Sequence, residues 1–151
     1  MILGIVGSEA AKFTPVTETA ALALIRKLCD ESVDGVVSGA CHLGGIDVWA
    51  AEEALKLGCV VREFPPASRQ WSEYRARNVK IASASDVVHV ITVRELPPDY
   101  TGMRFARCYH CKTAAHVKSG ACWTAKYAER QLGKAACWHV ISPDGVVSSS
   151  W

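Results

Sequence analysis

Short apolar runs alternate with segments of helical periodicity along almost the whole chain. Each apolar run ends at a turn signal, which predicts strands at residues 2–6, 35–39, 59–64, 86–93 and 135–141. In the intervening segments apolar residues recur every three or four positions, which predicts helices at residues 15–30, 46–57, 71–83 and 121–132. This alternation indicates an α/β fold, a Rossmann-like parallel sheet with helices on both faces. Val146 and Val147 are expected to add a short edge strand.

The length and the composition fit one compact domain that spans residues 1–151. Half of the residues are apolar and 21% are charged, which excludes intrinsic disorder. The net charge of +2 gives no electrostatic reason to expect a dedicated nucleic-acid or membrane binder. No apolar run approaches the ~20 residues that a membrane span needs, and residues 1–7 lack the features of a signal peptide. We therefore expect a cytoplasmic protein without a membrane partner.

Polar and glycine-rich segments follow the predicted strands, and they should meet at one edge of the sheet. In open parallel sheets, ligands bind beyond the carboxyl ends of the strands, where the strand order reverses. Glycines and helix N-termini at that edge suit a phosphate group, although the same glycines can simply form tight turns. The spacing is neither a dinucleotide-binding fingerprint nor a Walker motif. The candidate ligand-binding residues are Gly7, Ser8, Ser38, Gly39, Gly45, Asp47, Arg77, Asn78, Ser119, Gly120 and Thr124.

The segment 94–120, between the fourth strand and the last long helix, breaks the alternation and contains a Cys/His motif. The spacing is Cys-x2-Cys-x4-His-x5-Cys, formed by Cys108, Cys111, His116 and Cys122. Three thiolates and one imidazole can complete a tetrahedral zinc shell, so zinc is the candidate cofactor. Two alternatives stay open, namely reduced thiols packed under the loop and a redox-active pair. Seven cysteines, an odd number, exclude complete internal disulfide pairing.

Three of these segments resemble motifs of a known superfamily. Residues 38–47 read Ser-Gly-Ala-x4-Gly-Ile-Asp, Arg77-Asn78 precedes an Ile-Ala pair and an aspartate, and residues 119–124 read Ser-Gly-Ala-x-x-Thr. The chain is similar here to SLOG domains, which include the DNA-processing protein A family, the YspA-like proteins and the LOG phosphoribohydrolases. The turn at 41–44 is about one residue longer than the motif of that superfamily. The resemblance covers about residues 1–141 and implies a binder of a nucleotide or nucleotide derivative, with pairing into a homodimer through helices.

The same resemblance bears on catalysis. LOG phosphoribohydrolases use a glutamate and an arginine on the N-glycosidic bond; Arg77 matches the arginine, but Tyr127 stands at the glutamate position. Glu129 would point elsewhere on the helix. Asp47 is the best substitute, although it can equally be an ordinary helix-terminal carboxylate. Binding by a sensor or degenerate hydrolase is therefore the leading hypothesis. The alternatives are an active N-glycosidic hydrolase that uses Arg77 and Asp47, and a zinc-stabilised nucleic-acid adaptor.

Several aromatic and histidine side chains complete the sequence-based picture. Trp71, Tyr74 and Trp123 flank the expected crevice, where they can stack on a base or cover an edge of the core. His89 lies among valines in the fourth strand and His139 follows Trp138 in the fifth. We expect both histidines to be structural core residues rather than site residues.

Overall fold

A computed structural model describes residues 1–151 and contains one six-stranded sheet with the order β3-β2-β1-β4-β5-β6. The strands are β1 (Ile2–Gly7), β2 (Gly35–Ser38), β3 (Val60–Glu63), β4 (Val87–Val93), β5 (Ala135–Ile141) and β6 (Val147–Ser150). The first five are parallel, and β6 pairs antiparallel with β5 at one edge. The predicted single-domain parallel sheet is confirmed, and so is the short edge strand near Val147.

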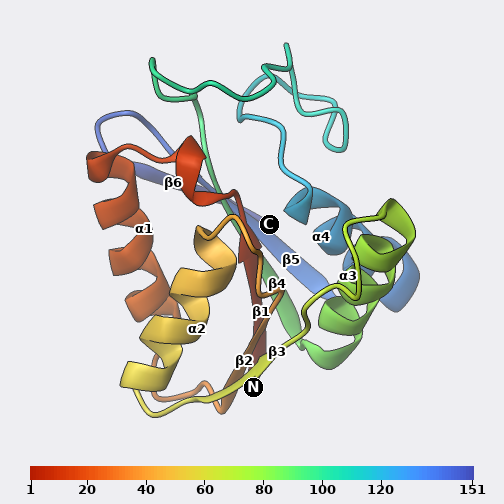
Figure 1. Ribbon diagram of the computed structural model, residues 1–151. Helices are drawn as coiled ribbons and strands as arrows, with labels where there is room; N and C mark the ends of the chain where they lie inside the picture. The colour runs from red at the N-terminus through yellow and green to blue at the C-terminus, as the bar shows by residue number, and fades with distance from the viewer.

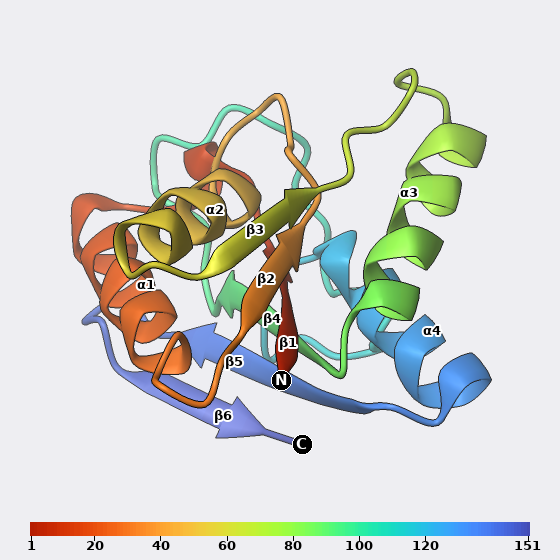
Figure 2. The same cartoon turned by 90° about the horizontal axis from the view of Figure 1, so that it is seen from below.

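Four helices cover the two faces of the sheet. They are α1 (Pro15–Leu28), α2 (Ile46–Lys56), α3 (Trp71–Ala84) and α4 (Ala121–Leu132), together with a 3₁₀ turn, η1 (Ala10–Lys12). The pair α1 and α2 lies on one face and the pair α3 and α4 on the other (Figure 2), which confirms the predicted layering. None of the helices is both long enough and apolar enough to span a bilayer.

Local sequence signals set the helix boundaries. At the start of α1, the Thr14 hydroxyl accepts a hydrogen bond from the Thr17 backbone N–H at 3.2 Å, and the Thr17 hydroxyl accepts one from the Thr14 N–H at 2.8 Å. Pro15 follows at the first helical position, where its missing N–H costs nothing. At the other end of the chain, α4 ends at Gly133, which adopts the left-handed conformation with φ of 61°.

The core consists of two apolar layers, one on each face of the sheet. Successive residues of a strand point to opposite faces, so Ile5 of β1 packs with Ile25 of α1, whereas Val6 packs with Ile81 of α3 and Ala125 of α4. Burial on both faces explains why the parallel strands read as continuous apolar runs in the sequence.

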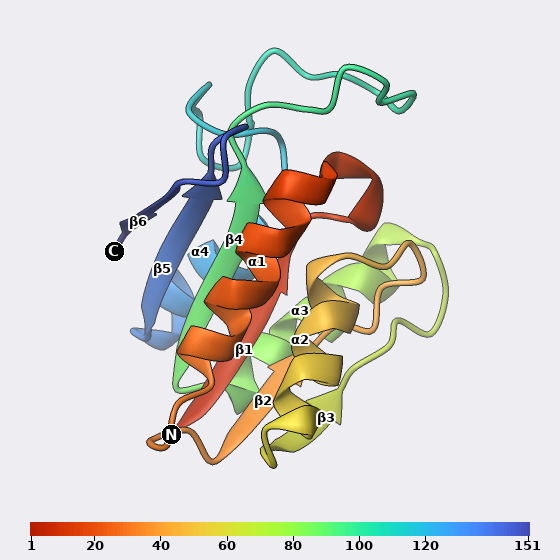
Figure 3. The same ribbon diagram turned by 90° about the vertical axis from the view of Figure 1, so that its left-hand side faces the viewer.

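The strand order reverses between β1 and β4, which lie side by side at the centre of the sheet. From β1 the chain moves outward to β2 and β3, then returns to β4 and continues outward to β5. The segment 94–120 leaves the carboxyl end of β4 and passes above this edge of the sheet (Figures 1 and 3). The fold therefore places the Cys/His segment next to the point where ligands bind in sheets of this kind.

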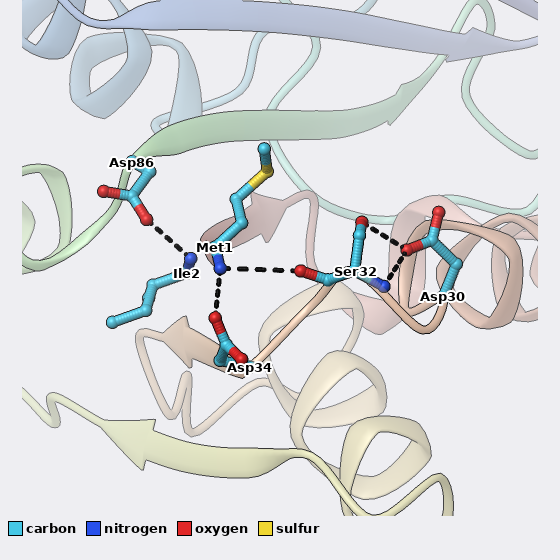
Figure 4. Close-up of polar contacts among 6 residues, drawn as sticks. All are labelled: Met1, Ile2, Asp30, Ser32, Asp34 and Asp86. Atoms are coloured by element: carbon cyan, nitrogen blue, oxygen red, sulfur yellow. Dashed lines mark hydrogen bonds and ion pairs between the residues drawn. The ribbon is translucent and has the colours of Figure 1, made fainter.

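Polar contacts around the start of β1 hold the amino ends of the central strands in place (Figure 4). The Ile2 N–H donates to the Asp86 carboxylate at 2.7 Å, which ties the start of β1 to the start of β4. The Met1 amino group donates to the Ser32 carbonyl oxygen at 3.5 Å and also contacts the Asp34 carboxylate. In the same loop the Ser32 N–H donates to Asp30 at 2.8 Å. These contacts join the start of β1 to β4 and to the loop before β2.

Candidate functional site

A cavity of about 340 Å³ opens at the carboxyl end of β1, beside the point where the strand order reverses. Nineteen residues line it, drawn from the end of β1, the η1 turn, the 41–43 loop, α2, α3 and the segment that leads into α4. The sequence-predicted residues in this lining are Gly7, Ser8, Asp47, Arg77, Asn78, Ser119, Gly120 and Thr124. Post-strand segments that lie far apart in the chain thus meet around one space.

Ser38, Gly39 and Gly45 lie outside the lining, and packing accounts for each of them. A Cβ at Gly39 would lie 2.3 Å from Arg77 Nη1 and 2.5 Å from Asp47 Oδ2, so glycine makes room for that pair. Gly45 has φ of +87°, and a Cβ there would lie 2.4 Å from the Ser8 carbonyl oxygen. The Ser38 hydroxyl donates to the Asp47 carbonyl oxygen at 3.0 Å. These three residues thus pack against lining residues and fix the shape of the cavity wall.

Asp47 and Arg77 form an ion pair in the cavity wall. Arg77 Nη1 lies 3.9 Å from Asp47 Oδ2, and both side chains are about nine-tenths buried. The guanidinium is also held by the Gly39 carbonyl oxygen and, through Nε at 2.8 Å, by Asn78 Oδ1. Burial raises the pKa of Asp47 to about 6, although Arg77 and the Gly7 N–H favour its ionised form. A carboxyl group that titrates near neutral pH therefore faces the cavity.

Three buried oxygen atoms in the cavity lining have no hydrogen-bond partner. They are Asp47 Oδ1, Ser119 Oγ and Thr124 Oγ1. Buried polar atoms are almost always paired in folded proteins, and each unpaired one costs about 1–3 kcal/mol. All three belong to residues around one cavity, so a single polar ligand there can supply the missing partners.

Cationic and aromatic side chains surround these oxygens. Lys12 and Lys118 line the cavity with Arg77, and Lys12 Nζ donates to the Lys118 carbonyl oxygen at 2.9 Å. Burial lowers the pKa of Lys12. The Tyr74 ring lies 5.4 Å from the Arg77 guanidinium carbon, and Trp71 also reaches the lining. The cavity therefore offers positive charge and an aromatic surface together.

The turn that opens α4 contributes to the cavity in an unexpected way. Gly120 adopts ordinary helical angles, φ −63° and ψ −24°, and an added Cβ would meet no atom within 4 Å. Neither the backbone conformation nor the internal packing of the protein requires glycine at this position. Gly120 belongs to the cavity lining, where the absence of a side chain leaves the N-terminus of α4 uncovered.

Among the lining residues that the sequence analysis did not name are Glu9, directly before the η1 turn, and Lys12, at its end. Their position directly after a strand at the switch point was the signal that could have identified them. Tyr100 of the 94–120 segment donates to the Glu9 carboxylate at 3.2 Å, so this segment reaches across to the same turn. Of the aromatic candidates, Trp123 lies elsewhere: it stacks on Tyr127 with ring centroids 5.3 Å apart, outside the cavity lining.

A second cluster lies in the 94–120 segment and the first turn of α4. The ligand atoms of Cys108, Cys111, His116 and Cys122 all lie within 4.8 Å of one another. The sequence prediction that these four residues gather is therefore confirmed, and the group can hold a metal ion. All seven cysteines of the chain are free thiols.

Contacts within this cluster lower the pKa of two of its thiols, Cys108 and Cys111, and raise the pKa of the third, Cys122. The Cys108 N–H donates to the Thr113 carbonyl oxygen at 2.8 Å, which closes a tight turn around the Cys-x2-Cys pair. The Cys122 thiol and the backbone N–H groups of Ser119, Cys111 and His110 donate to Cys108, which lowers the pKa of Cys108 to about 4. Contacts with Cys122 and His116 lower the pKa of Cys111 to about 6. Thiolates are the form that binds metals.

Outer contacts orient the other two ligands of the cluster. His116 Nδ1 lies 2.7 Å from the Val117 carbonyl oxygen. A carbonyl can only accept, so Nδ1 carries the proton and Nε2 keeps its lone pair for a metal. Trp138 Nε1 donates to Cys122 Sγ at 3.4 Å. The four ligands thus have supporting partners of the kind that tune metal centres.

A comparison with protein-family models and a comparison with curated proteins both found no match. The resemblance to SLOG domains therefore depends on the motif residues alone.

Proposed function

We propose that the chain binds a nucleotide, or a phosphorylated derivative of one, in the cavity at the carboxyl end of β1. The observation that carries this proposal is the set of three buried, unpaired oxygens in one cavity, on Asp47, Ser119 and Thr124. The resemblance of the surrounding segments to SLOG motifs supports the same ligand class.

Each part of the cavity has a role in this proposal. The N-terminus of α4, with the Ser119 and Thr124 hydroxyls, takes the phosphate, because helix N-termini attract anions and hydroxyls donate hydrogen bonds to phosphate oxygens. Lys118 and Lys12 supply positive charge beside it. Asp47 Oδ1 accepts a hydrogen bond from a sugar hydroxyl, and the Tyr74 ring supports the base.

A thermal-shift screen tests this proposal, because any ligand of the native state raises the melting temperature. Nucleoside mono- and diphosphates and nucleotide sugars should stabilise the protein, whereas the matching nucleosides without phosphate should not. Thr124→Val should abolish the shift without lowering the melting temperature of the free protein, because the hydroxyl that it removes has no partner. Thr19→Val, on the outer side of α1, is the control. No shift with any phosphorylated compound would contradict the proposal.

The cavity also supports N-glycosidic hydrolysis as a second candidate function. The observation that favours it is the Asp47 carboxyl group, whose pKa of about 6 and position 3.9 Å from Arg77 suit proton transfer near neutral pH. Tyr127, at the glutamate position of the SLOG enzymes, lies outside the cavity lining. Release of free base from nucleoside monophosphates by the wild type, and its loss in Asp47→Asn, would support hydrolysis. Equal rates in both would exclude Asp47 from the chemistry.

We further propose that zinc occupies the cluster of Cys108, Cys111, His116 and Cys122. Three thiolates and one imidazole leave no open position in a tetrahedral shell, which is the donor set of structural zinc sites. Its role is to hold the 94–120 segment over the cavity. Purified protein should contain one zinc ion bound at this cluster, and Cys111→Ser should release it, whereas Cys59→Ser should not. A cluster that stays metal-free when zinc is supplied would contradict this assignment.

A further inference from the structure

A third group of potential ligands lies in the sheet, away from the cavity and from the Cys₃His cluster. His89 of β4 is the register partner of Cys137 of β5, and His139 lies two residues further along β5. All three side chains are on the face that α1 covers, because their strand neighbours Val88 and Trp138 pack on the α3 and α4 face. The ligand atoms of the three lie within 4.8 Å of one another.

These three residues are buried, unlike side chains that lie close together by chance on a protein surface. His89, Cys137 and His139 are 6%, 1% and 4% exposed. The His89 ring stacks against the His139 ring with centroids 5.1 Å apart. Two imidazoles in an apolar layer cost more to bury than the valines around them, and coordination of a metal ion would offset that cost.

The nitrogen atoms already lie near coordination distance. His89 Nδ1 and His139 Nε2 are 2.9 Å apart. With metal–nitrogen bonds of about 2.0 Å, a tetrahedral site requires about 3.3 Å between two nitrogens. The ion would therefore take the place of this hydrogen bond after the rings separate by about 0.4 Å, a movement within the reach of small side-chain rotations. The proton between the two nitrogens would move to the outer nitrogen of its ring, and the Cys137 thiol would release its proton to solvent.

A contact outside the group orients one of its members. His139 Nδ1 lies 2.7 Å from the Ser149 hydroxyl of β6, which fixes the ring and leaves Nε2 facing His89. The ring is therefore held in a position from which Nε2 can coordinate a metal ion.

An entry route leads to this group. A cavity of about 300 Å³ lies between the sheet and α1, and both histidines line it. Asp30 and Ser32, the loop residues drawn in Figure 4, belong to the same lining. This opening gives a metal ion access from solvent and provides space for a fourth ligand such as water.

We infer that His89, Cys137 and His139 form a second metal site, which binds a divalent transition-metal ion of the zinc class with one coordination position open. Two imidazoles and one thiolate match the ligand preference of zinc, and three protein ligands with a free position distinguish this site from the closed Cys₃His cluster.

Cobalt(II) is the probe that tests this inference, because a thiolate bound to cobalt gives a near-ultraviolet charge-transfer band. Metal-free, reduced wild-type protein should bind two cobalt ions per chain. Cys137→Ser and His139→Ala should each lower this number to one. Cys111→Ser should also lower it to one by disabling the other cluster, and Cys59→Ser should leave it at two. Two ions in both Cys137→Ser and His139→Ala, or a single ion in the wild type that Cys111→Ser removes, would overturn the inference.

A measurement on the wild type alone covers the case in which a variant fails to fold. With the Cys₃His cluster first filled with zinc, one further cobalt ion should produce a charge-transfer band of single-thiolate intensity, about a third of that of a three-thiolate site. The absence of this band would show that the histidine pair and Cys137 bind no metal.

Discussion

Ser119 connects the thiol cluster to the cavity: its backbone N–H donates to the Cys108 sulfur, while its hydroxyl lies buried and unpaired in the cavity lining. The Ser119 carbonyl oxygen also accepts from the Cys122 N–H at 3.2 Å, in the first turn of α4. Both backbone polar groups of Ser119 are thus hydrogen-bonded to candidate metal ligands. We therefore expect the position of its hydroxyl to depend on the state of the cluster.

The first prediction follows from this contact. Removal of metal with a chelator should weaken binding of the nucleotide that gives the largest thermal shift, by about tenfold, because loss of one positioned hydrogen bond to a charged group costs about 1.5 kcal/mol or more. Isothermal titration calorimetry before and after chelation measures the change. Cys111→Ser should bind as weakly as the chelated wild type and should not respond further to chelator. Equal affinities of holo and metal-free protein would show that the cluster and the cavity are independent.

The second prediction concerns Asp47 and pH. The pKa of Asp47 is 3.8 in an unfolded chain and about 6 in the folded protein. At pH values between these two, the carboxyl group is ionised in the unfolded state and still protonated in the folded state. Folding stability therefore falls as the pH rises from about 4 to above 6, and the cost is absent below about pH 4. Asp47→Asn does not ionise, so at pH 7.5 it should exceed the wild type in stability by up to about 3 kcal/mol.

Urea unfolding at several pH values measures this difference, which should shrink toward zero near pH 4. Glu52→Gln, an exposed substitution on the same helix, is the control and should show no such trend. An Asp47→Asn variant less stable than the wild type at pH 7.5 would mean that the contact with Arg77 outweighs the burial of the carboxylate.

The third prediction contrasts two glycines. Gly39→Ala should destabilise the protein by about 1–3 kcal/mol, because its Cβ would collide with Arg77 and Asp47. Gly120→Ala should leave stability unchanged or raise it slightly, since its Cβ meets no atom and its φ is helical. The same Gly120→Ala change should weaken the nucleotide-induced thermal shift. Equal stability of the two variants would contradict the packing role assigned to Gly39.

The fourth prediction concerns Lys134, whose ammonium group donates to three carbonyl oxygens at the end of α3, those of Ala82, Ser83 and Ser85, at 2.9, 2.8 and 2.6 Å. A cation at a helix C-terminus stabilises the helix. Lys134→Met should therefore lower the free energy of unfolding by about 1–2 kcal/mol. Lys80→Met, on the exposed side of α3, is the matched control. A loss no larger than that of the control would show that this cap contributes nothing.

The sequence predicted the layers of the fold well, for a physical reason. Strands buried on both faces are mostly apolar, so β1, β4 and β5 are visible as apolar runs, interrupted by His89 and Thr92 in β4 and by His139 in β5. The sequence analysis gave no direction for β6, although the short turn at Pro143-Asp144-Gly145 allows only an antiparallel neighbour of β5. In the structure, the Gly145 N–H donates to the Ser142 carbonyl oxygen at 2.8 Å in this turn. The end of α1 at Leu28 rather than residue 30 reflects the non-helical angles of Cys29.

The candidate site was predictable in part. Most of the predicted residues line one cavity, since parallel strands end on one side of the sheet, whereas Ser38, Gly39 and Gly45 lie behind the lining. Two relationships needed coordinates: the burial that raises the pKa of Asp47, and the contact between His89 and His139. That contact joins residues 50 positions apart and depends on the register between β4 and β5, which local periodicity does not encode.

The reversal of strand order also governs when a growing chain acquires its cavity. The Ser8 and Thr92 hydroxyls, 2.8 Å apart across the β1–β4 junction, are separated by 84 positions, and the lining is completed only by Thr124 of α4. During synthesis, β1 must wait for β4 to emerge before the central pairing forms, and α4 must follow before a ligand finds all its partners. A bound ligand therefore stabilises only the chain that has completed α4, and it would protect finished molecules from proteolysis while leaving shorter nascent chains exposed.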